Sequence, residues 1–196
     1  MPFFDYLTDE AGVTDIARAE PEKFVHLGAF TQAVLRGPSP LSEAERELIA
    51  AYVSGVNDCQ YCHGVHSATA ANFGVDPTLF ENLLADLDSA TVDDRLRALL
   101  AYARKLTQTP SRMTDADAQS VFDAGCTPDE LRDTVTICAL FNFYNRLIEG
   151  HGIKGYADLF TRNGARLAKE GYGNAAKGAL NRGKSAGITR TRDPSP

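Results

Sequence analysis

Apolar residues recur every three to four positions along most of this chain. The stretch that follows Ser42 shows the pattern clearly, because Leu48, Ile49, Tyr52 and Val53 would lie on one side of a helix. This spacing is typical of an amphipathic helix, whereas a half-buried strand would alternate apolar and polar residues. No segment shows clean alternation. We therefore predict an all-α fold.

Capping residues, prolines and glycines divide the pattern into separate helices. Ser42 and Glu45 form a capping-box sequence, and Thr127 followed by Pro128 is a strong helix start. A loose similarity between the segments that begin at Leu41 and at Thr127 would fit a duplicated helical unit. We expect helices over residues 21–36, 42–56, 59–73, 77–87, 91–107, 114–124 and 127–149.

Two thiols and two imidazoles lie within eight residues, at Cys59, Cys62, His63 and His66. Thiol pairs at this spacing serve as a redox couple, as part of a zinc site or as a haem attachment point. On a helix all four side chains can share one face. The Asn-Asp pair before Cys59 is a good N-cap sequence, which would place Cys59 in the first turn, where the helix dipole favours a thiolate. The geometry favours redox chemistry.

The other readings of the thiol pair have less support. Zinc usually takes four ligands, or three and a water, and the two remaining cysteines, Cys126 and Cys138, are isolated residues. Haem attachment requires export, and the N-terminus lacks the basic start and long apolar core of a signal peptide. Buried thiols that only pack remain an alternative. We expect neither a metal nor a cofactor.

Glu47 lies twelve residues before Cys59. The stretch Glu47-x11-Cys59-x2-Cys62-x3-His66 resembles the signature of the alkylhydroperoxidase D and carboxymuconolactone decarboxylase superfamily, and the chain looks most like its peroxidase-related branch. The resemblance covers residues 20–155 and implies an alkylhydroperoxidase D-like helical fold, a homo-oligomer, and a thiol and proton-relay site made of these four residues. Decarboxylase members generally lack the thiol pair, so its presence points to the redox side.

These observations predict a thiol-dependent peroxidase that reduces hydroperoxides through a Cys59–Cys62 disulfide. We expect the peroxide to react with Cys62, because His66 lies one turn away and Glu47 would complete the relay. Cys59, nearer the helix start, would meet an unidentified thiol reductant. Two alternatives stay open: a disulfide-exchange or redox-sensing protein with negligible peroxide turnover, and a decarboxylase-like lyase in which the thiols are incidental.

Four further residues are secondary candidates for the site. His63 and Tyr61 lie inside the thiol motif, whereas Asn142 and Asn145 lie one turn apart on the long apolar helix. Buried polar groups find partners, so the main interpretation of the two asparagines is a structural network at a helix or subunit contact. A role in lining a pocket is the alternative.

Composition and charge argue against several other classes of function. The 196 residues carry a net charge of −6, which argues against a general nucleic-acid binder, and no apolar run reaches membrane-spanning length. Four cysteines without a secretory leader suggest a reducing, cytoplasmic compartment. Residues 163–196 hold seven basic and two acidic residues and are rich in glycine. We therefore expect a domain over residues 1–162 and a basic extension over 163–196 that contributes subunit contacts but no catalytic group.

Overall fold

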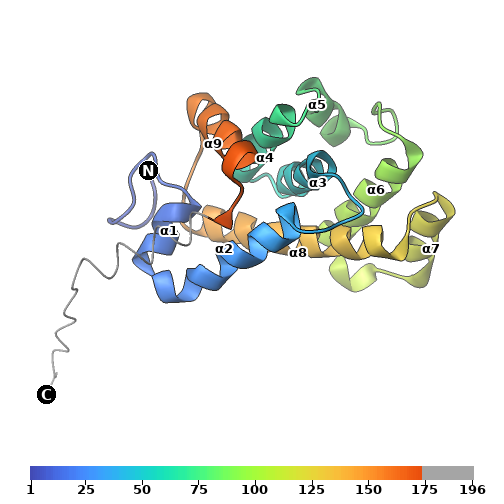
Figure 1. The fold of residues 1–196 in the computed structure, drawn as a ribbon, viewed down its shortest axis with the longest axis horizontal. Coiled ribbons are helices and arrows are strands. Elements are labelled where there is room, and N and C mark those ends of the chain that lie inside the picture. The colour runs from blue at the N-terminus through green and yellow to red at the C-terminus, as the bar shows by residue number, and fades with distance from the viewer. Residues whose placement is uncertain (174–196) are drawn as a thin grey trace, which may run out of the picture.

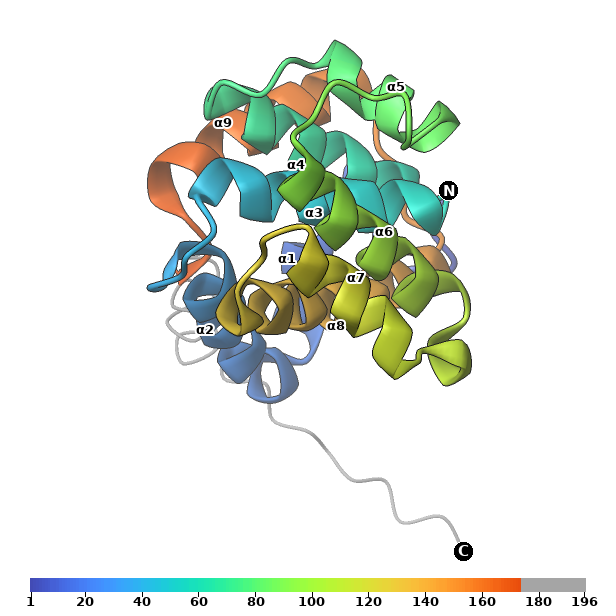
Figure 2. The ribbon, with the colours of Figure 1, turned by 90° about the vertical axis from the view of Figure 1, so that its right-hand side faces the viewer.

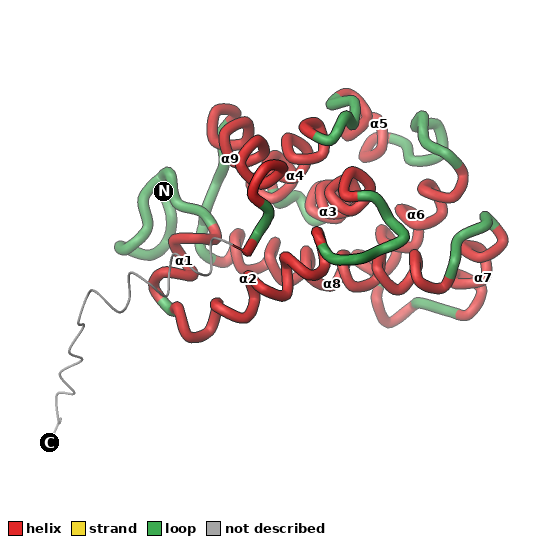
Figure 3. Tube along the Cα trace, viewed as in Figure 1, coloured by secondary structure: helices red, strands yellow, loops and turns green. Residues whose placement is uncertain are grey.

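Helix α3 (Glu43–Val56) lies at the centre of the fold. The computed structural model describes residues 1–173, and this part of the chain consists of helices and connecting loops without a strand, so the all-α prediction is confirmed (Figure 3). The other elements are α1 (Val13–Ala19), α2 (Pro21–Arg36), α4 (Gln60–Asn72), α5 (Thr78–Ala85), α6 (Asp94–Gln108), the 3₁₀ helix η1 (Pro110–Arg112), α7 (Asp115–Asp123), α8 (Pro128–Gly150) and α9 (Ala157–Glu170).

The helices are arranged around α3 in two groups. Helices α4, α5 and α9 lie on one side of it, and α2, α7 and α8 lie on the other (Figures 1 and 2). The residues of α3 from Arg46 to Ser54 are all buried, which is expected for a helix that is covered on every face. Its start is fixed by the predicted capping box, in which the Ser42 hydroxyl accepts a hydrogen bond from the backbone N–H of Glu45. Helix α3 therefore supplies buried positions on which a site can be built.

The connection between α3 and α4 differs from the prediction. Asp58 adopts a left-handed conformation with φ of 54°, and the backbone N–H of Cys59 donates to the carbonyl of Ser54 over 2.9 Å. This tight turn delays the next helix, so Cys59 itself is the N-cap of α4 rather than a residue of its first turn. The expectation that the Asn-Asp pair caps this helix was wrong, because a residue in the left-handed region does not take up the extended conformation of an N-cap.

Helix α9 crosses the boundary that composition placed between residues 162 and 163. It lies along α4 (Figure 1), and the two backbones approach closely at Gly164. A Cβ atom at this position would lie 2.7 Å from the Cβ of Ala68 and 2.8 Å from its carbonyl carbon. This glycine therefore serves helix packing. Residues 174–196 lie outside the described part of the chain, so what was expected of them stays a prediction.

None of the helices within residues 1–173 has the length and apolar character needed to cross a membrane.

Candidate active site

Glu47 is a fully buried carboxylate on α3 that contacts three side chains from three other segments. Its Oε2 lies 2.7 Å from Nδ1 of His66 on α4. Its Oε1 lies 2.6 Å from Nη2 of Arg36, the last residue of α2. The hydroxyl of Tyr172, which follows α9, donates to the same Oε1 over 2.6 Å. The structure thus brings the predicted pair of Glu47 and His66 together and adds two partners that the sequence did not indicate.

The charges around Glu47 decide its protonation state. Burial by itself would raise the pKa of this carboxyl, but the charge and hydrogen bond of His66, the Arg36 guanidinium and the Tyr172 hydroxyl together lower the pKa below its usual value. Glu47 is therefore a carboxylate, and Arg36 balances its charge. Because the carboxylate only accepts, Nδ1 of His66 is assigned as the donor in either protonation state of the ring; in the neutral form, Nε2 carries the lone pair. His66 is set up to act as a base.

Arg36 is held in place by aromatic rings. Its guanidinium carbon lies 5.0 Å from the ring centroid of Phe73 and 5.1 Å from that of Tyr172. Cation–π contacts of this kind stabilise the planar guanidinium of Arg36 between the two rings, and they are stronger where water is excluded. The side chain of Arg36 is only 6% exposed, so its pairing with Glu47 takes place in a low-dielectric environment.

Tyr172 is anchored by both its backbone and its ring. The side-chain carbonyl of Gln32 accepts hydrogen bonds from the backbone N–H groups of Tyr172, over 2.6 Å, and Gly173, over 3.1 Å. The ring of Tyr172 stacks on that of His66 at an interplanar angle of 10°. Burial, followed by the charge of Glu47, raises the pKa of the Tyr172 hydroxyl well above its usual value, so the group stays a donor. The segment that was expected to hold no catalytic group thus contributes a residue to the site.

Replacing Tyr172 with phenylalanine tests the contribution of this hydroxyl. The variant keeps the ring but leaves Glu47 without one donor, so we expect the free energy of unfolding to fall by about 1.5–3 kcal/mol. Urea denaturation at pH 7 measures the change. The control is Tyr6→Phe, since Tyr6 is 53% exposed, and it should match the wild type. Equal stability of Tyr172→Phe and the wild type would show that the hydroxyl does not hold Glu47.

The two thiols of the motif differ in their surroundings. Cys62 lies at the wall of a cavity with His66, whereas Cys59 has no exposed surface and is not among the cavity-lining residues of the described chain. All four cysteines are free. The neighbouring Cys59 thiol, through hydrogen bonding, and burial raise the pKa of Cys62 well above its usual value, while Asn145 lowers it in part. Cys62 is therefore a protonated thiol beside a potential base.

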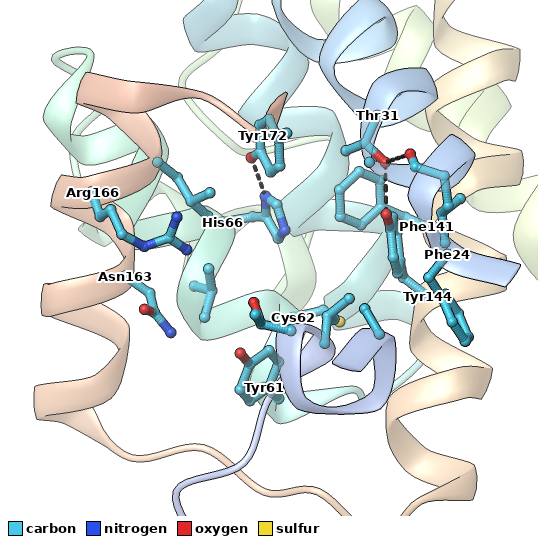
Figure 4. Close-up of a pocket in the computed structure, with 17 residues that line it drawn as sticks. Phe24, Thr31, Tyr61, Cys62, His66, Phe141, Tyr144, Asn163, Arg166 and Tyr172 are labelled. Atoms are coloured by element: carbon cyan, nitrogen blue, oxygen red, sulfur yellow. Dashed lines mark hydrogen bonds between the residues drawn. The ribbon is translucent and has the colours of Figure 1, made fainter. Parts of the chain in front are cut away.

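The cavity has a volume of about 110 Å³ and opens between α1, α2, α4, α8 and α9. Figure 4 shows Cys62 and His66 between two walls, with Phe24 and Tyr144 on one side and Arg166 on the other. Most of the lining is apolar. Volumes of this order suit a small organic molecule. The lining residues are Val13, Thr14, Ala17, Phe24, Leu27, Gly28, Thr31, Tyr61, Cys62, Val65, His66, Phe141, Tyr144, Asn163, Arg166, Leu167 and Tyr172.

Tyr61 and His63, the secondary candidates within the motif, lie in different places. Tyr61 lines the cavity and is buried. His63 lies outside it: its Nδ1 is 2.9 Å from the carbonyl oxygen of Ala51, and its ring meets the edge of Phe80. The expectation that the motif presents all four of its Cys and His side chains together is therefore wrong for His63, because α4 directs it towards α5.

Asn142 and Asn145 belong to a polar network between α8 and the turn after α3. The side-chain amide of Asn57 donates to Oδ1 of Asn142 over 3.2 Å and to Oδ1 of Asn145 over 2.9 Å. Asn145 in turn donates to the hydroxyl of Ser54 over 3.0 Å. The network fixes the turn that carries Cys59, and neither asparagine lines the cavity.

The polar side chains of residues 1–173 include no group of three or more His, Cys, Asp or Glu that is arranged to hold a metal ion.

Comparison with known proteins gives a family match that spans the site residues. Residues 21–105 match the carboxymuconolactone decarboxylase family, and this range includes Glu47, both motif cysteines and His66. No curated protein matches the chain.

The solved structures with a similar fold include two peroxidase-related proteins. One is a peroxidase-related protein from Silicibacter sp. TM1040, with 29% sequence identity and a TM-score of 0.70 over 76% of this chain and 78% of that one. The other is a peroxidase-related protein from Ralstonia eutropha JMP134, described as an alkylhydroperoxidase AhpD core, with 25% identity and a TM-score of 0.68 over 74% of this chain and 76% of that one. The family match over residues 21–105 and the shared helical fold support the assignment of this chain to the alkylhydroperoxidase D-like and carboxymuconolactone decarboxylase superfamily.

Proposed function

We propose that this protein is a thiol-dependent peroxidase that reduces organic hydroperoxides. The observation that carries the proposal is the position of the Cys62 thiol, which lines a small apolar cavity next to a histidine held by a buried carboxylate. A second thiol, Cys59, lies close enough to interact with it. The names of the two similar structures agree with peroxidase chemistry.

The first step is the activation of Cys62. Because the pKa of this thiol is raised, it needs a base, and Nε2 of His66 takes the proton. The charge of Glu47 stabilises the imidazolium that forms. The Cys62 thiolate attacks the terminal oxygen of the hydroperoxide, the O–O bond breaks, and the departing alkoxide takes the proton back from His66. The products are a Cys62 sulfenic acid and an alcohol.

The second step closes the disulfide. The Cys59 thiol attacks the sulfenic sulfur, and water leaves with the Cys59 proton and the sulfenic hydroxyl. Two equivalents of a thiol, or one dithiol, then reduce the Cys59–Cys62 disulfide and are themselves oxidised to a disulfide.

The reductant is proposed to attack Cys62, not Cys59 as the sequence suggested. Of the two sulfur atoms, the one on the cavity wall is that of Cys62, while Cys59 is fully buried. Cys59 would leave as a thiolate at the N-terminus of α4, where the helix dipole favours a negative charge. Cys59 is therefore well placed to be the leaving group when the Cys59–Cys62 disulfide is reduced.

Steady-state turnover tests the proposal. Purified protein is supplied with tert-pentyl hydroperoxide and dithiothreitol, and the alcohol product is measured by gas chromatography. We expect kcat/KM for the hydroperoxide to exceed the second-order rate constant for its reaction with free cysteine by at least about 100-fold, the scale of general-base assistance in a positioned site. A rate equal to that of free cysteine would reject a peroxidase and favour a disulfide-exchange or sensing protein.

A further inference from the structure

Arg166 gives the cavity a charge that the peroxidase chemistry does not use. Of the cavity-lining residues in the described chain, Arg166 is the only Lys, Arg, Asp or Glu. Behind the wall, Glu47 and Arg36 form an ion pair and balance each other. The cavity lining therefore carries a positive charge on the side of α9, while the acidic residues nearby, Glu10, Asp15 and Glu170, line the adjoining surface hollow that Arg166 also borders.

The guanidinium of Arg166 lacks a protein partner within residues 1–173. No carboxylate of this part of the chain lies within 4.0 Å of it, and its side chain makes no hydrogen bond there. The nearest candidate on α1, Asp15, is already paired with Arg18 over 2.6 Å. Arg166 is half-buried and its guanidinium nitrogens still reach water, so the group is free to bind an anion that enters the cavity in place of that water.

Asn163 lies one turn before Arg166 on the same helix. Both side chains line the cavity, and Figure 4 shows both on the wall opposite Phe24 and Tyr144. An arginine can bind both oxygens of a carboxylate at once, and a neighbouring amide can donate a further hydrogen bond. The opposite wall presents the rings of Phe24 and Tyr144, and the Tyr144 hydroxyl is already paired with that of Thr31 over 2.6 Å, so this wall suits a hydrocarbon group.

We propose that Arg166 and Asn163 form a carboxylate-binding subsite, and that the ligand of this cavity is a small organic anion with an apolar carbon skeleton. The identity of the substrate rests in addition on the proposed peroxidase activity. If the cavity binds an organic anion and Cys62 reduces hydroperoxides, the substrate is a hydroperoxide that carries a carboxylate. The carboxylate binds at Arg166 on α9, the carbon skeleton lies against Phe24 on α2, and the peroxide group reaches Cys62 on α4.

Binding of an unreactive anion tests the subsite without any turnover. Isothermal titration calorimetry at pH 7.5 compares hexanoate with 1-hexanol, which has the same carbon chain but no charge. We expect wild-type protein to bind hexanoate more tightly than 1-hexanol. In Arg166→Gln the affinity for hexanoate should fall at least about tenfold, which corresponds to about 1.4 kcal/mol, while 1-hexanol binds within about twofold of wild type.

Two further variants distinguish the loss of the Arg166 charge from nonspecific effects of a substitution on the fold. Arg166→Lys keeps the charge but loses the bidentate geometry, so its affinity for hexanoate should lie between those of wild type and Arg166→Gln. Arg162→Gln removes an exposed arginine from the same helix that does not line the cavity, and it should bind like wild type. Thermal unfolding confirms that each variant is folded. Absence of hexanoate binding to wild type, or equal affinity in Arg166→Gln, would overturn the subsite.

Turnover of a matched substrate pair tests the second part of the inference. The pair is 3-hydroperoxy-3-methylbutanoate and tert-pentyl hydroperoxide, which differ by a carboxylate in place of a methyl group. Wild type should show a kcat/KM at least about tenfold higher for the anion, and Arg166→Gln should lose this preference. If hexanoate binding depends on Arg166 but neither hydroperoxide is reduced, the peroxidase proposal fails and the anion subsite stands. If both are reduced at equal rates, the substrate class is wrong and the peroxidase proposal stands.

Discussion

Cys62→Ser is expected to lower hydroperoxide turnover by more than about 100-fold. Cys62 is the motif thiol that lines the cavity and lies one turn from His66, so its loss removes the group that would form the covalent sulfenic intermediate. Serine is nearly the same size, and Cys62 is only 3% exposed, so the fold should tolerate the change. The measurement is alcohol production from tert-pentyl hydroperoxide in the presence of dithiothreitol.

Cys126→Ser provides the matched control for this experiment. Cys126 is also buried, but its Sγ contacts the backbone carbonyl of Arg95, away from the cavity. This variant should keep turnover within about twofold of wild type. If Cys62→Ser retains as much activity as Cys126→Ser, another group carries the reaction and the proposed role of Cys62 is wrong.

Glu47→Gln is expected to lower the free energy of unfolding at pH 7 by about 3–5 kcal/mol. The substitution removes one partner of a buried ion pair and leaves the Arg36 guanidinium with only the more distant and partly exposed Glu43 carboxylate, 4.0 Å from its Nε. It also removes the acceptor that orients His66, so turnover should fall by about 100-fold or more. Urea denaturation and the same turnover assay measure the two effects. The control Glu22→Gln changes an exposed carboxylate on α2 that makes no ion pair within residues 1–173, and it should cost less than about 1 kcal/mol.

The stability difference between wild type and Glu47→Gln should depend on pH. The pKa of Glu47 is lower in the folded protein than its ordinary value of 4.5, so the unfolded chain binds the proton first as the pH falls. The stabilisation by this carboxylate is therefore fully present above about pH 4.5 and is lost as the pH falls from there through the folded-state pKa. Denaturation at pH 5, 4 and 3.5 should show the largest difference at pH 5 and a narrower one at each of the two lower values. A difference that stays constant down to pH 3.5 would contradict the lowered pKa.

Local sequence signals predicted most of the helical framework. The capping box at Ser42 and the start at Thr127 both lie where the structure has them, because such caps act over three or four residues. The resemblance to the family signature implied a site that includes Glu47, Cys62 and His66, and the structure joins Glu47 to His66.

The partners that complete the site depend on contacts that no local pattern contains. Tyr172 is 125 positions from Glu47 in the sequence, and Arg36 meets Glu47 only because α2 ends beside α3. Helix α9, which brings Tyr172 and Arg166 to the cavity, did have a signal in the spacing of Leu159 and Leu167, two turns apart. The glycine and basic content of the segment obscured it, since composition does not distinguish a packing glycine from a linker glycine.

The start of α4 was predicted at the wrong residue for a different reason. Asparagine and aspartate are good N-cap residues, and they are also the non-glycine residues that most readily adopt a left-handed conformation. At Asp58 the second preference prevails, since the turn lets the N–H of Cys59 bond to α3. The choice between two favourable local conformations was made by a contact with the preceding helix.

Trapping of the sulfenic acid tests the central claim, that hydroperoxide oxidises Cys62, most directly. Cys59→Ser and Cys62→Ser proteins are each treated with one equivalent of tert-pentyl hydroperoxide in the presence of dimedone, and the modified peptides are identified by mass spectrometry. We predict a dimedone adduct on Cys62 in Cys59→Ser, where no second thiol can close the disulfide, and none on Cys59 in Cys62→Ser. An adduct found only on Cys59, in Cys62→Ser, would contradict the account and exchange the roles of the two cysteines.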